Sequence, residues 1–421
     1  MLTKAPKGTA DILPENSYKW QYAENVIKKL CADFGVKEIR TPVFEHTELF
    51  SRGVGDTTDV VEKEMYTFND KGQRSITLRP EGTAGAARSF IEHGLFNNPQ
   101  PTKLFYQISC YRYEKPQAGR MREFHQFGVE YFGTQNYAAD AEIIELALML
   151  FGRLGLKDLT LRINSIGCPH CRKAYNDKLK EYLSANYDEL CDTCKSRFDR
   201  NPMRIIDCKS SVCKDIIKDA PRLIDYLCDE CSEHFANVKS SLDNMGIEYE
   251  IDPDIVRGLD YYTKTVFEIT ADIASSNATV CGGGRYDGLV KELGGPDTPA
   301  CGFAIGMERL FLCLEAQNVE INDESAMQIF VGNIGAESAK FAQKLVHDLR
   351  LLGISADYDK LDRSVKAQMK QANKLGCKYS VIIGDNEITE GKVMLKNMAL
   401  GESAEVELNA QAIAKNIEEN Y

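Results

Sequence analysis

The chain has 421 residues, of which 43% are hydrophobic and 27% charged, with a formal net charge of −12. This composition is typical of a globular protein and excludes fibrous and disordered chains, and the length predicts two or three domains of about 150 residues. The longest apolar run, residues 143–151, is too short to span a bilayer, and residues 1–10 lack an export signal, so we expect a cytoplasmic protein with no membrane anchor. The acidic balance of 51 basic and 63 acidic residues argues against a general nucleic-acid binder.

The first part of the chain alternates between predicted helices and strands. An amphipathic helix is expected over residues 18–34, ending at Gly35, and a strand over 36–40 should stop at Thr41-Pro42, because proline cannot donate to a central ladder. Further strands are predicted over residues 75–78, 103–113 and 123–132. The polar stretch between the last two predicts a long antiparallel hairpin.

Eight of the fourteen cysteines lie in a module over residues 168–245 that is otherwise predicted to be mostly helical. They form four close pairs: Cys168 and Cys171, Cys191 and Cys194, Cys208 and Cys213, Cys228 and Cys231. Without an export signal, thiols or metal ligands are favoured over disulfides. The spacing suits two zinc sites of four thiolates each, or one site with spare thiols, with a structural role. An iron–sulfur cluster is a less favoured alternative, and His170 and His234 are candidate substitute ligands.

The last third of the chain has a different pattern of predicted strands and helices. Strands are expected near 266–270 and 301–305, followed by a helix over 307–315 and a polar linker over 316–326. Strand, helix, strand, helix and strand then follow over 328–334, 338–352, 354–358, 364–375 and 379–383, which predicts a small α/β domain with parallel pairing. Residues 338–378 hold nine basic and four acidic side chains, a balance of 9 − 4 = +5. Such a stretch can bind RNA phosphates, although a solvated helix face is the ordinary explanation.

The predicted hairpin carries polar side chains where a strand is otherwise apolar. Gln126 and Glu130 share one face of its second strand, because side chains alternate with a period of two. A polar face on a buried strand is costly unless it meets a ligand. Arg112, Lys115, Arg120 and Arg122 lie on the same hairpin, and guanidinium groups match phosphate oxygens in a two-point fork. Taken alone, the hairpin could equally be a solvated surface element.

Four further motifs are weak in isolation. They are Arg-Pro-Glu-Gly-Thr at 79–83, Arg-Gly-Leu-Asp-Tyr-Tyr-Thr at 257–263, Cys-Gly-Gly-Gly-Arg-Tyr-Asp at 281–287 and Gly-Phe-Ala-Ile-Gly-Met-Glu-Arg-Leu at 302–310. Each has a plain structural explanation: a surface turn, core aromatics, a glycine turn or a packed strand–helix junction.

Taken in order, however, these motifs closely resemble the class II aminoacyl-tRNA synthetases, and specifically the histidyl-tRNA synthetase family. Thr41-Pro42 resembles the first class motif at the dimer interface, residues 111–130 the second and residues 302–310 the third. Residues 257–262 and 282–287 resemble two signatures peculiar to the histidyl family. The resemblance extends from Lys7-Gly-Thr-Ala-Asp-Ile-Leu-Pro14 to the C-terminal domain.

The resemblance implies a fold and a reaction. The fold would be an α+β catalytic core over residues 1–325, an antiparallel sheet with flanking helices, with the helical cysteine-rich insertion 168–245 inside it. Residues 326–421 would form an α/β anticodon-binding domain. The homodimer would use ATP with Mg²⁺ to activate L-histidine as histidyl-adenylate and transfer it to the 3′ end of tRNA(His). The rival is a non-catalytic regulatory subunit of the first enzyme of histidine biosynthesis, a class that typically lacks the C-terminal domain.

The resemblance also implies residue roles. Arg112 would bind the α-phosphate of ATP, and Arg120 and Arg309 its outer phosphates. The expected histidine site comprises Glu81, Thr83, Arg112, Gln126, Glu130, Arg257, Tyr261 and Tyr262. Arg257, with Arg112, would stabilise the α-phosphate as the carboxylate attacks, since fixed cations offset the repulsion between two anions. Glycines 282–284 would allow close approach of the backbone.

Overall fold

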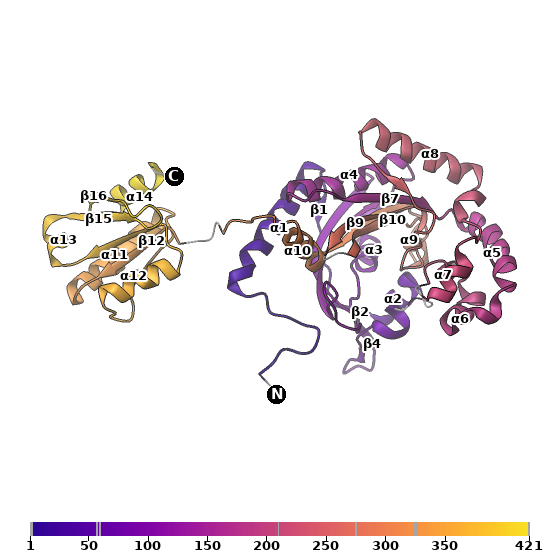
Figure 1. Ribbon diagram of the computed structural model, residues 1–421, viewed down its shortest axis with the longest axis horizontal. Helices are drawn as coiled ribbons and strands as arrows, with labels where there is room; N and C mark the ends of the chain where they lie inside the picture. Colours follow the sequence, from indigo (N-terminus) through magenta and orange to yellow (C-terminus); the bar gives the residue numbers. More distant parts are fainter. Residues whose placement is uncertain are drawn as a thin grey trace. The chain divides into compact units, whose positions relative to one another are not determined.

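The structure is a computed structural model that describes residues 3–55, 58, 60–208, 210–273, 276–323 and 327–419. The chain forms two compact units, Met1–Glu320 and Ile321–Tyr421, each with a large sheet of its own (Figure 1). Among the described residues, no helix combines the length and the apolarity needed to cross a bilayer.

A mixed eight-stranded sheet forms the centre of the larger unit. Its strands lie in the order β1 (Lys37–Glu38), β5 (Thr102–Tyr111), β6 (Glu123–Phe132), β11 (Ala300–Gly306), β10 (Ser276–Arg285), β9 (Thr263–Ile273), β7 (Thr160–Ser165) and β8 (Glu250–Ile251). The two edge pairs, β1–β5 and β7–β8, are parallel, and the other described neighbours are antiparallel. β5 and β6 form the predicted hairpin, with Thr102 opposite Phe132 and Tyr111 opposite Glu123.

A second, three-stranded sheet stands beside the first. It consists of β2 (Phe44–His46), β4 (Ser75–Leu78) and β3 (Thr67–Asn69), with β4 in the middle and both neighbours antiparallel to it. Of these strands the sequence predicted only β4, because β2 and β3 have three residues each and too few side chains to show a period.

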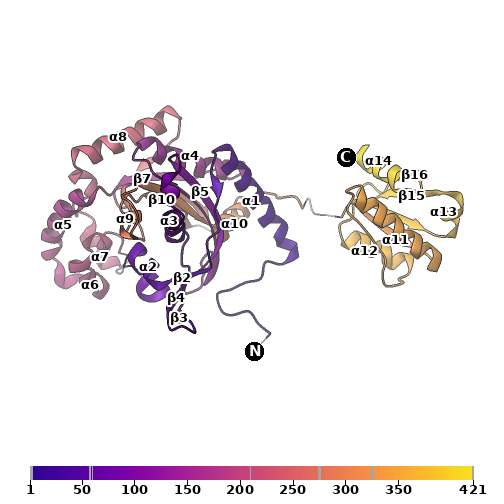
Figure 2. The same cartoon turned by 180° about the vertical axis from the view of Figure 1, so that it is seen from behind.

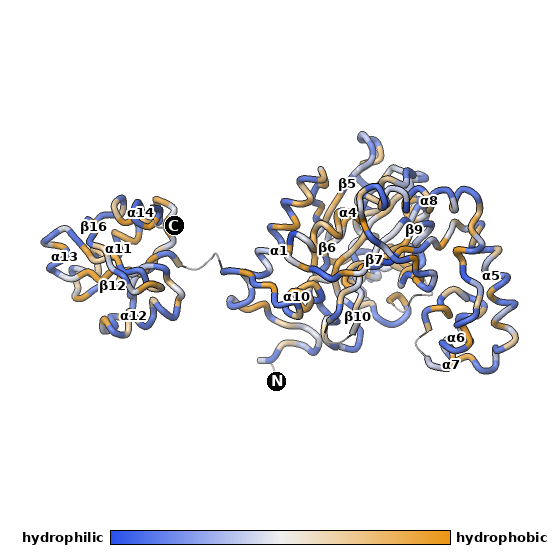
Figure 3. The backbone as a smooth tube through the Cα atoms, turned by 45° about the horizontal axis from the view of Figure 1, so that its top comes forward, coloured by the Kyte–Doolittle hydropathy of each residue, from blue (hydrophilic) through white to orange (hydrophobic). Residues whose placement is uncertain are grey.

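Helices flank the large sheet, as predicted. Outside the insertion they are α1 (Pro14–Asp33), α2 (Thr47–Val54), α3 (Thr83–Glu92), α4 (Tyr137–Arg153), α9 (Leu289–Glu292) and α10 (Met307–Ala316), with a π-turn at Val60–Glu64 and a 3₁₀ turn at Leu95–Asn97. α4 packs against β10 and β11, and α1 packs against α4. In Figure 3 hydrophilic and hydrophobic residues alternate along helices such as α8, as expected of helices with one buried face.

The insertion is mostly helical, as the sequence predicted. It comprises α5 (Pro169–Ser184), α6 (Asp192–Arg200), α7 (Ser211–Ile217) and α8 (Asp229–Asn244), with 3₁₀ turns at Tyr187–Glu189, Pro202–Ile205 and Leu223–Tyr226. Buried aliphatic side chains such as Leu179, Leu183 and Ile205 give it a core continuous with that of the sheet. α8 lies beside α4 in both views of the larger unit (Figures 1 and 2). The insertion therefore packs against the rest of the larger unit, through α8 and through the shared core.

Two expectations about this unit differ from the structure. The predicted strand over 36–40 is only Lys37–Glu38, a short edge strand. The first helix begins at Pro14 rather than residue 18, because the fixed φ of proline suits a first helical turn. A helix over α4 was not predicted. Its residues are buried on several sides, between the sheet, α1 and α8, so no polar stripe marks it.

The smaller unit confirms the predicted alternation of strand and helix. Its sheet has the order β13 (Ala356–Tyr358), β12 (Ile329–Asn333), β14 (Tyr379–Ile383), β15 (Lys392–Asn397) and β16 (Ser403–Glu407). The first three strands are parallel, and β15 and β16 add an antiparallel edge. The helices are α11 (Ala336–Leu351), α12 (Val365–Lys374), α13 (Asp385–Glu390) and α14 (Ala410–Glu419). Parallel neighbours need crossover connections, which α11 and α12 supply.

Candidate active site

One cavity of about 330 Å³ in the larger unit collects every residue that the sequence singled out for histidine or ATP. Its lining includes Glu81, Thr83, Arg112, Arg120, Gln126, Glu130, Arg257, Tyr261, Tyr262 and Arg309. These ten residues come from four separate stretches of the chain, and the sheet topology places β6, β11 and β10 side by side. Its lining holds two chemically different groups: the neighbouring carboxyl groups Glu81 and Glu130, here called the carboxylate end, and the neighbouring arginines Arg112, Arg120 and Arg309, here called the guanidinium end.

Glu130 is the centre of the carboxylate end. It is 1% exposed, and its Oε1 accepts hydrogen bonds from Thr83 Oγ1 (2.7 Å) and the Tyr106 hydroxyl (2.9 Å), while the Tyr286 hydroxyl donates to its Oε2. Burial raises the pKa of Glu130 to about 8, although these hydrogen bonds act in the opposite direction. A buried carboxyl group that is held in place and poised near neutral pH is suited to bind a cationic ligand.

Glu81 and Gln126 complete this end. The carboxylate of Glu81 accepts from the N–H groups of Thr83 (2.6 Å) and Ala84 (2.8 Å), which fixes it at the beginning of α3. Burial raises the pKa of Glu81 above its ordinary value despite those bonds. Gln126 Oε1 accepts from the Gly82 N–H at 3.0 Å. Its amide NH₂ therefore has a defined orientation.

The guanidinium end is formed by the hairpin and α10. Arg112 Nε donates to the Pro80 carbonyl (2.8 Å), and its guanidinium lies 5.3 Å from the ring centroid of Phe124. Arg309 Nη1 donates to the Thr279 carbonyl at 2.6 Å. Burial lowers the pKa of Arg309, and the nearby Arg120 lowers it further. Neighbouring guanidinium groups repel each other, and a bound anion would reduce this repulsion.

Arg257 also lines the cavity. Its Nη1 donates to Glu268 on β9, and its guanidinium lies 5.5 Å from the ring centroid of Tyr262. A Cβ at Gly282 would come 2.2 Å from Arg257 Nη2, so only glycine there leaves room for this side chain. The side chain of Arg257 thus lies directly against the backbone at Gly282. Gly283 and Gly284 instead face the neighbouring strands β11 and β9.

Two tyrosines that hold Glu130 were not predicted from the sequence. Tyr106 and Tyr286 are each 1% exposed, and both donate to Glu130. Tyr106 sits in a strand whose other residues are mostly apolar, so it reads as a core aromatic. Tyr286 was inside a recognised motif, but only its hydroxyl contact reveals that it supports the carboxylate.

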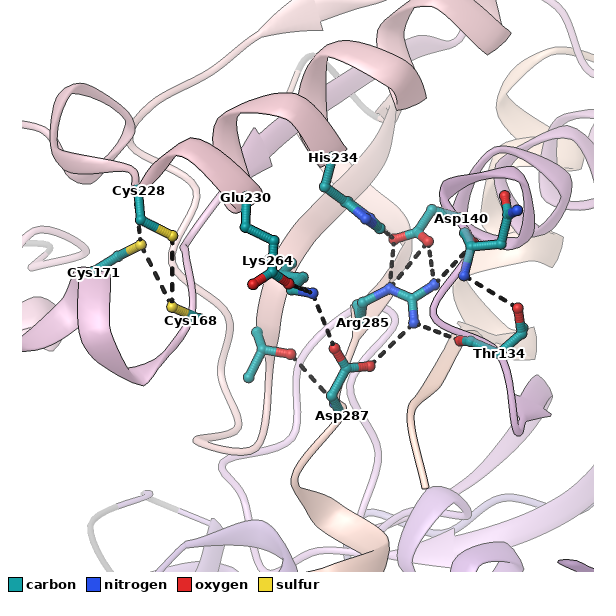
Figure 4. Close-up of polar contacts among 12 residues, drawn as sticks. Thr134, Asp140, Cys168, Cys171, Cys228, Glu230, His234, Lys264, Arg285 and Asp287 are labelled. Carbon is teal, nitrogen blue, oxygen red and sulfur yellow. Dashed lines mark hydrogen bonds and ion pairs between the residues drawn. The ribbon is translucent and has the colours of Figure 1, made fainter. Parts of the chain in front are cut away.

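A network of buried ion pairs supports the motif at residues 281–287. Arg285 is fully buried and donates to Asp140 of α4, which is 1% exposed. The Nη1 atom of Arg285 also lies 3.0 Å from the carboxylate of Asp287 (Figure 4). His234 Nε2 of α8 lies 3.5 Å from Asp140. Burial alone would raise the pKa of Asp140, but Arg285 and His234 outweigh it and lower that pKa below its ordinary value. The network joins α4, α8 and the end of β10.

The eight insertion cysteines form two groups of four. Cys168 and Cys171 meet Cys228 and Cys231 in one group, here called the first tetrad, and Cys191, Cys194, Cys208 and Cys213 form the second tetrad. Within each tetrad the four sulfur atoms lie within 4.8 Å of one another. All eight thiols thus fall into two separate groups, and neither His170 nor His234 belongs to a tetrad.

Comparison with known proteins agrees with this geometry. The family model for histidyl-tRNA synthetase matches residues 8–310, and the model for the anticodon binding domain matches residues 328–420. The chain belongs to the histidyl-tRNA synthetase family. The motif-based prediction is thus confirmed, and with it the class of ATP-dependent aminoacyl-tRNA ligases and the predicted fold.

Individual relatives of this family resemble the chain over nearly its whole length. The histidine–tRNA ligase of Acetivibrio thermocellus is 58% identical over 97% of this chain and 98% of its own. That of Clostridium perfringens is 56% identical over 98% and 99%. The apo histidyl-tRNA synthetase of S. aureus has a TM-score of 0.84 at 43% identity, covering 99% of both chains. These similarities favour the ligase over the regulatory subunit of histidine biosynthesis.

Proposed function

We propose that the cavity of the larger unit is where L-histidine and ATP react to give histidyl-adenylate and pyrophosphate. The histidyl group is then transferred to the 3′ end of tRNA(His), and AMP leaves. The main support for this proposal is that ten motif residues line one cavity, which has a carboxylate end and a guanidinium end. An amino acid presents an ammonium group and ATP presents phosphates, so the two ends match the two substrates. The enzyme would act as a cytoplasmic protein, and none of the fourteen cysteines forms a disulfide, which suits a reducing compartment.

At the acidic end, Glu81 and Glu130 would hold the ammonium of histidine, with Thr83 and Gln126 as further polar contacts. Tyr261 and Tyr262 would line the imidazole. Imidazole has both a donor and an acceptor, so a pocket that bonds both rejects apolar mimics strongly.

At the cationic end, Arg112 would bind the α-phosphate, and Arg120 and Arg309 the outer phosphates. One carboxylate oxygen of histidine attacks the α-phosphorus, the bond to the bridging oxygen breaks, and pyrophosphate leaves with its electron pair. Arg257 and Arg112 would stabilise the extra charge on the pentavalent phosphorus. Mg²⁺ would neutralise the phosphates of ATP, and Glu114 and Glu308 of the cavity wall are oxygen donors that such a hard cation accepts.

A direct test is histidine-dependent exchange of pyrophosphate into ATP, followed by charging of tRNA(His). Exchange that requires histidine and Mg²⁺, together with formation of histidyl-tRNA, is the expected result. A folded, pure protein without exchange would refute the assignment of the cavity.

The pH dependence of histidine binding supplies the first quantitative prediction. With the pKa of Glu130 near 8, this carboxyl group is mostly protonated in the free enzyme at pH 7, and the ammonium of histidine prefers the ionised form. Binding should therefore tighten by about fivefold from pH 7 to pH 8, with release of a proton. Calorimetric titration in buffers of different ionisation enthalpy would measure both quantities. The variant Glu130→Gln should bind more weakly and lose this proton release; an unaltered release in that variant would contradict the assignment.

We further propose that each cysteine tetrad binds one structural Zn²⁺. Tetrahedral zinc with Zn–S bonds of about 2.3 Å requires sulfur–sulfur distances of about 3.8 Å. The Sγ distances are 3.6 Å for Cys168–Cys171, 4.0 Å for Cys168–Cys228 and 3.8 Å for Cys191–Cys208. These edges fit one ion per tetrad, whereas a cluster of several iron atoms would need a wider cage.

Metal analysis of purified protein gives the second prediction. The wild-type chain should carry two Zn²⁺, and Cys168→Ser should retain one, because three thiolates hold zinc more weakly than four. Cys377→Ser is the matched control, since it changes a buried thiol of the smaller unit that belongs to neither tetrad. Wild-type protein without zinc would end the proposal, and stoichiometric iron would replace it with the iron–sulfur alternative.

The proposed domains are a catalytic domain over 1–325, containing the insertion 168–245, and an anticodon-binding domain over 326–421. In the smaller unit Lys366, Lys370 and Lys374 recur every four residues on α12, and all three are exposed. Side chains with this spacing share one helix face, so they can follow an RNA backbone. The family match to an anticodon binding domain supports this role.

The proposed homodimer would form near Thr41-Pro42. Next to it, Val43 is 42% exposed and Phe44 57% exposed, and Phe68 of the same small sheet is 48% exposed. Such a group of exposed apolar side chains is suited to bury itself against a second copy of the chain. Analytical ultracentrifugation would measure the dimer.

A further inference from the structure

The first tetrad lies directly beside the loop that carries Tyr261 and Tyr262. Gly167, which precedes Cys168, accepts through its carbonyl from the Lys264 N–H at 2.9 Å, and the Ile166 N–H donates to the Lys264 carbonyl at 2.8 Å. Lys264 has a φ of 47°, a left-handed conformation that non-glycine residues seldom adopt. The segment that leads into the first two ligands therefore holds an unfavourable bend two residues after Tyr262.

Arg172 makes a second connection from the same ligand pair. It follows Cys171 in α5, and its Nη2 donates to the backbone carbonyl of Tyr262 while its Nε donates to the Ile166 carbonyl at 3.2 Å. One planar guanidinium thus ties the entry of α5 to the backbone of a pocket tyrosine. Any shift of the α5 N-terminus would be transmitted to Tyr262.

The other two ligands, Cys228 and Cys231, lie at the N-terminus of α8. Glu230 stands between them, and its Oε1 accepts from Lys264 Nζ at 2.9 Å. Lys264 Nζ also lies 3.8 Å from Asp287 (Figure 4). The second ligand pair therefore reaches the same lysine as the first.

From Asp287 the contacts continue to the pocket. The Asp287 N–H donates to Thr263 Oγ1 at 3.2 Å, and its carboxylate pairs with the fully buried Arg285. Tyr286 lies between these two residues in the chain and donates its hydroxyl to Glu130. Arg285 and Asp287, on either side of Tyr286, are thus both connected to α8. Arg285 is connected through Asp140 and His234, and Asp287 through Lys264 and Glu230.

We infer that the first tetrad is a positioning centre for the histidine pocket: an ion there joins the N-termini of α5 and α8 and so fixes the backbone of Tyr262 and the segment that presents Tyr286. Arg172 and Lys264 are positioning residues, since neither lines the cavity. This inference rests on the proposed zinc site and the proposed histidine pocket. It adds that the metal supports amino-acid recognition as well as the stability of the insertion.

Arg172→Met tests the inference because it removes both donors but leaves every cysteine in place. We expect a normal content of two zinc ions, a KM for histidine raised about tenfold and an unchanged KM for ATP, as for loss of a group that orients a binding residue. Lys173→Met is the matched control at the next, exposed position, where all three quantities should stay at wild-type values. Should Arg172→Met fail to fold, Arg172→Lys keeps the charge but cannot reach both carbonyls, and the same split is expected.

Cys168→Ser supplies the readout that does not depend on turnover. Calorimetry without ATP should show weaker histidine binding together with the loss of one zinc ion. Wild-type protein without metal would overturn the zinc site and this inference together. Normal zinc with an unchanged histidine KM in Arg172→Met, or an equal rise of the KM values for histidine and ATP, would overturn the positioning role alone.

Discussion

Replacing Arg257 by alanine is expected to lower the rate of histidyl-adenylate formation by about 10²–10³-fold, the usual cost of removing one fixed donor from a developing negative charge. Arg257 is held by Glu268 and passes over Gly282 into the cavity, so its charge is fixed before the reaction begins. It should interact more strongly with the pentavalent phosphorus than with ground-state ATP. The loss should therefore appear in kcat, with little change in the KM for ATP.

Pyrophosphate exchange at varied ATP and histidine concentrations would measure these constants. Arg120→Ala is the informative comparison, because a residue that holds an outer phosphate should raise the KM for ATP more than it lowers kcat. If Arg257→Ala weakened ATP binding and slowed the reaction to the same extent, its role in the transition state would be refuted.

Removal of Asp140 should have the largest effect on stability. Arg285 is 0% and Asp140 1% exposed, so Asp140→Ala would leave a fully buried guanidinium without its main carboxylate partner. Breaking such a pair typically lowers the free energy of unfolding by about 3–5 kcal/mol. Trp20 is the single tryptophan and lies in the larger unit, so its fluorescence during urea unfolding would report on this unit.

An exposed ion pair provides the control for Asp140→Ala, and the lowered pKa of Asp140 predicts how its effect on stability depends on pH. Glu181→Ala removes half of an exposed pair with Lys178, and its unfolding midpoint should equal that of the wild type. Because the pKa of Asp140 is lowered in the folded state, its stabilising effect is present above the unfolded pKa of about 3.9 and is lost as the pH falls toward the folded value. The difference between wild type and Asp140→Ala should narrow in acid; a difference that widened would contradict the network.

The candidate site could be predicted from sequence because its residues lie in short motifs with fixed internal spacing. Gln126 and Glu130 are four residues apart on one strand, and the strand period places both on the same face. The supporting residues could not be found in this way. Tyr106 looks like any buried aromatic, and Asp140 lies in a helix without an amphipathic pattern, 145 residues before the arginine it binds.

By itself, the sequence determined the family, the reaction and most regular elements, since motifs, periodicity and cysteine spacing are local properties of the chain. It also identified eight cysteines as ligand candidates. Only the tertiary structure decided that Cys168 and Cys171 join Cys228 and Cys231, with the second tetrad nested between them in the chain. The same holds for the contacts that link α5 and α8 to the tyrosine loop and to Arg285. Partners so far apart in sequence are chosen by sheet order and helix packing, which no local pattern encodes.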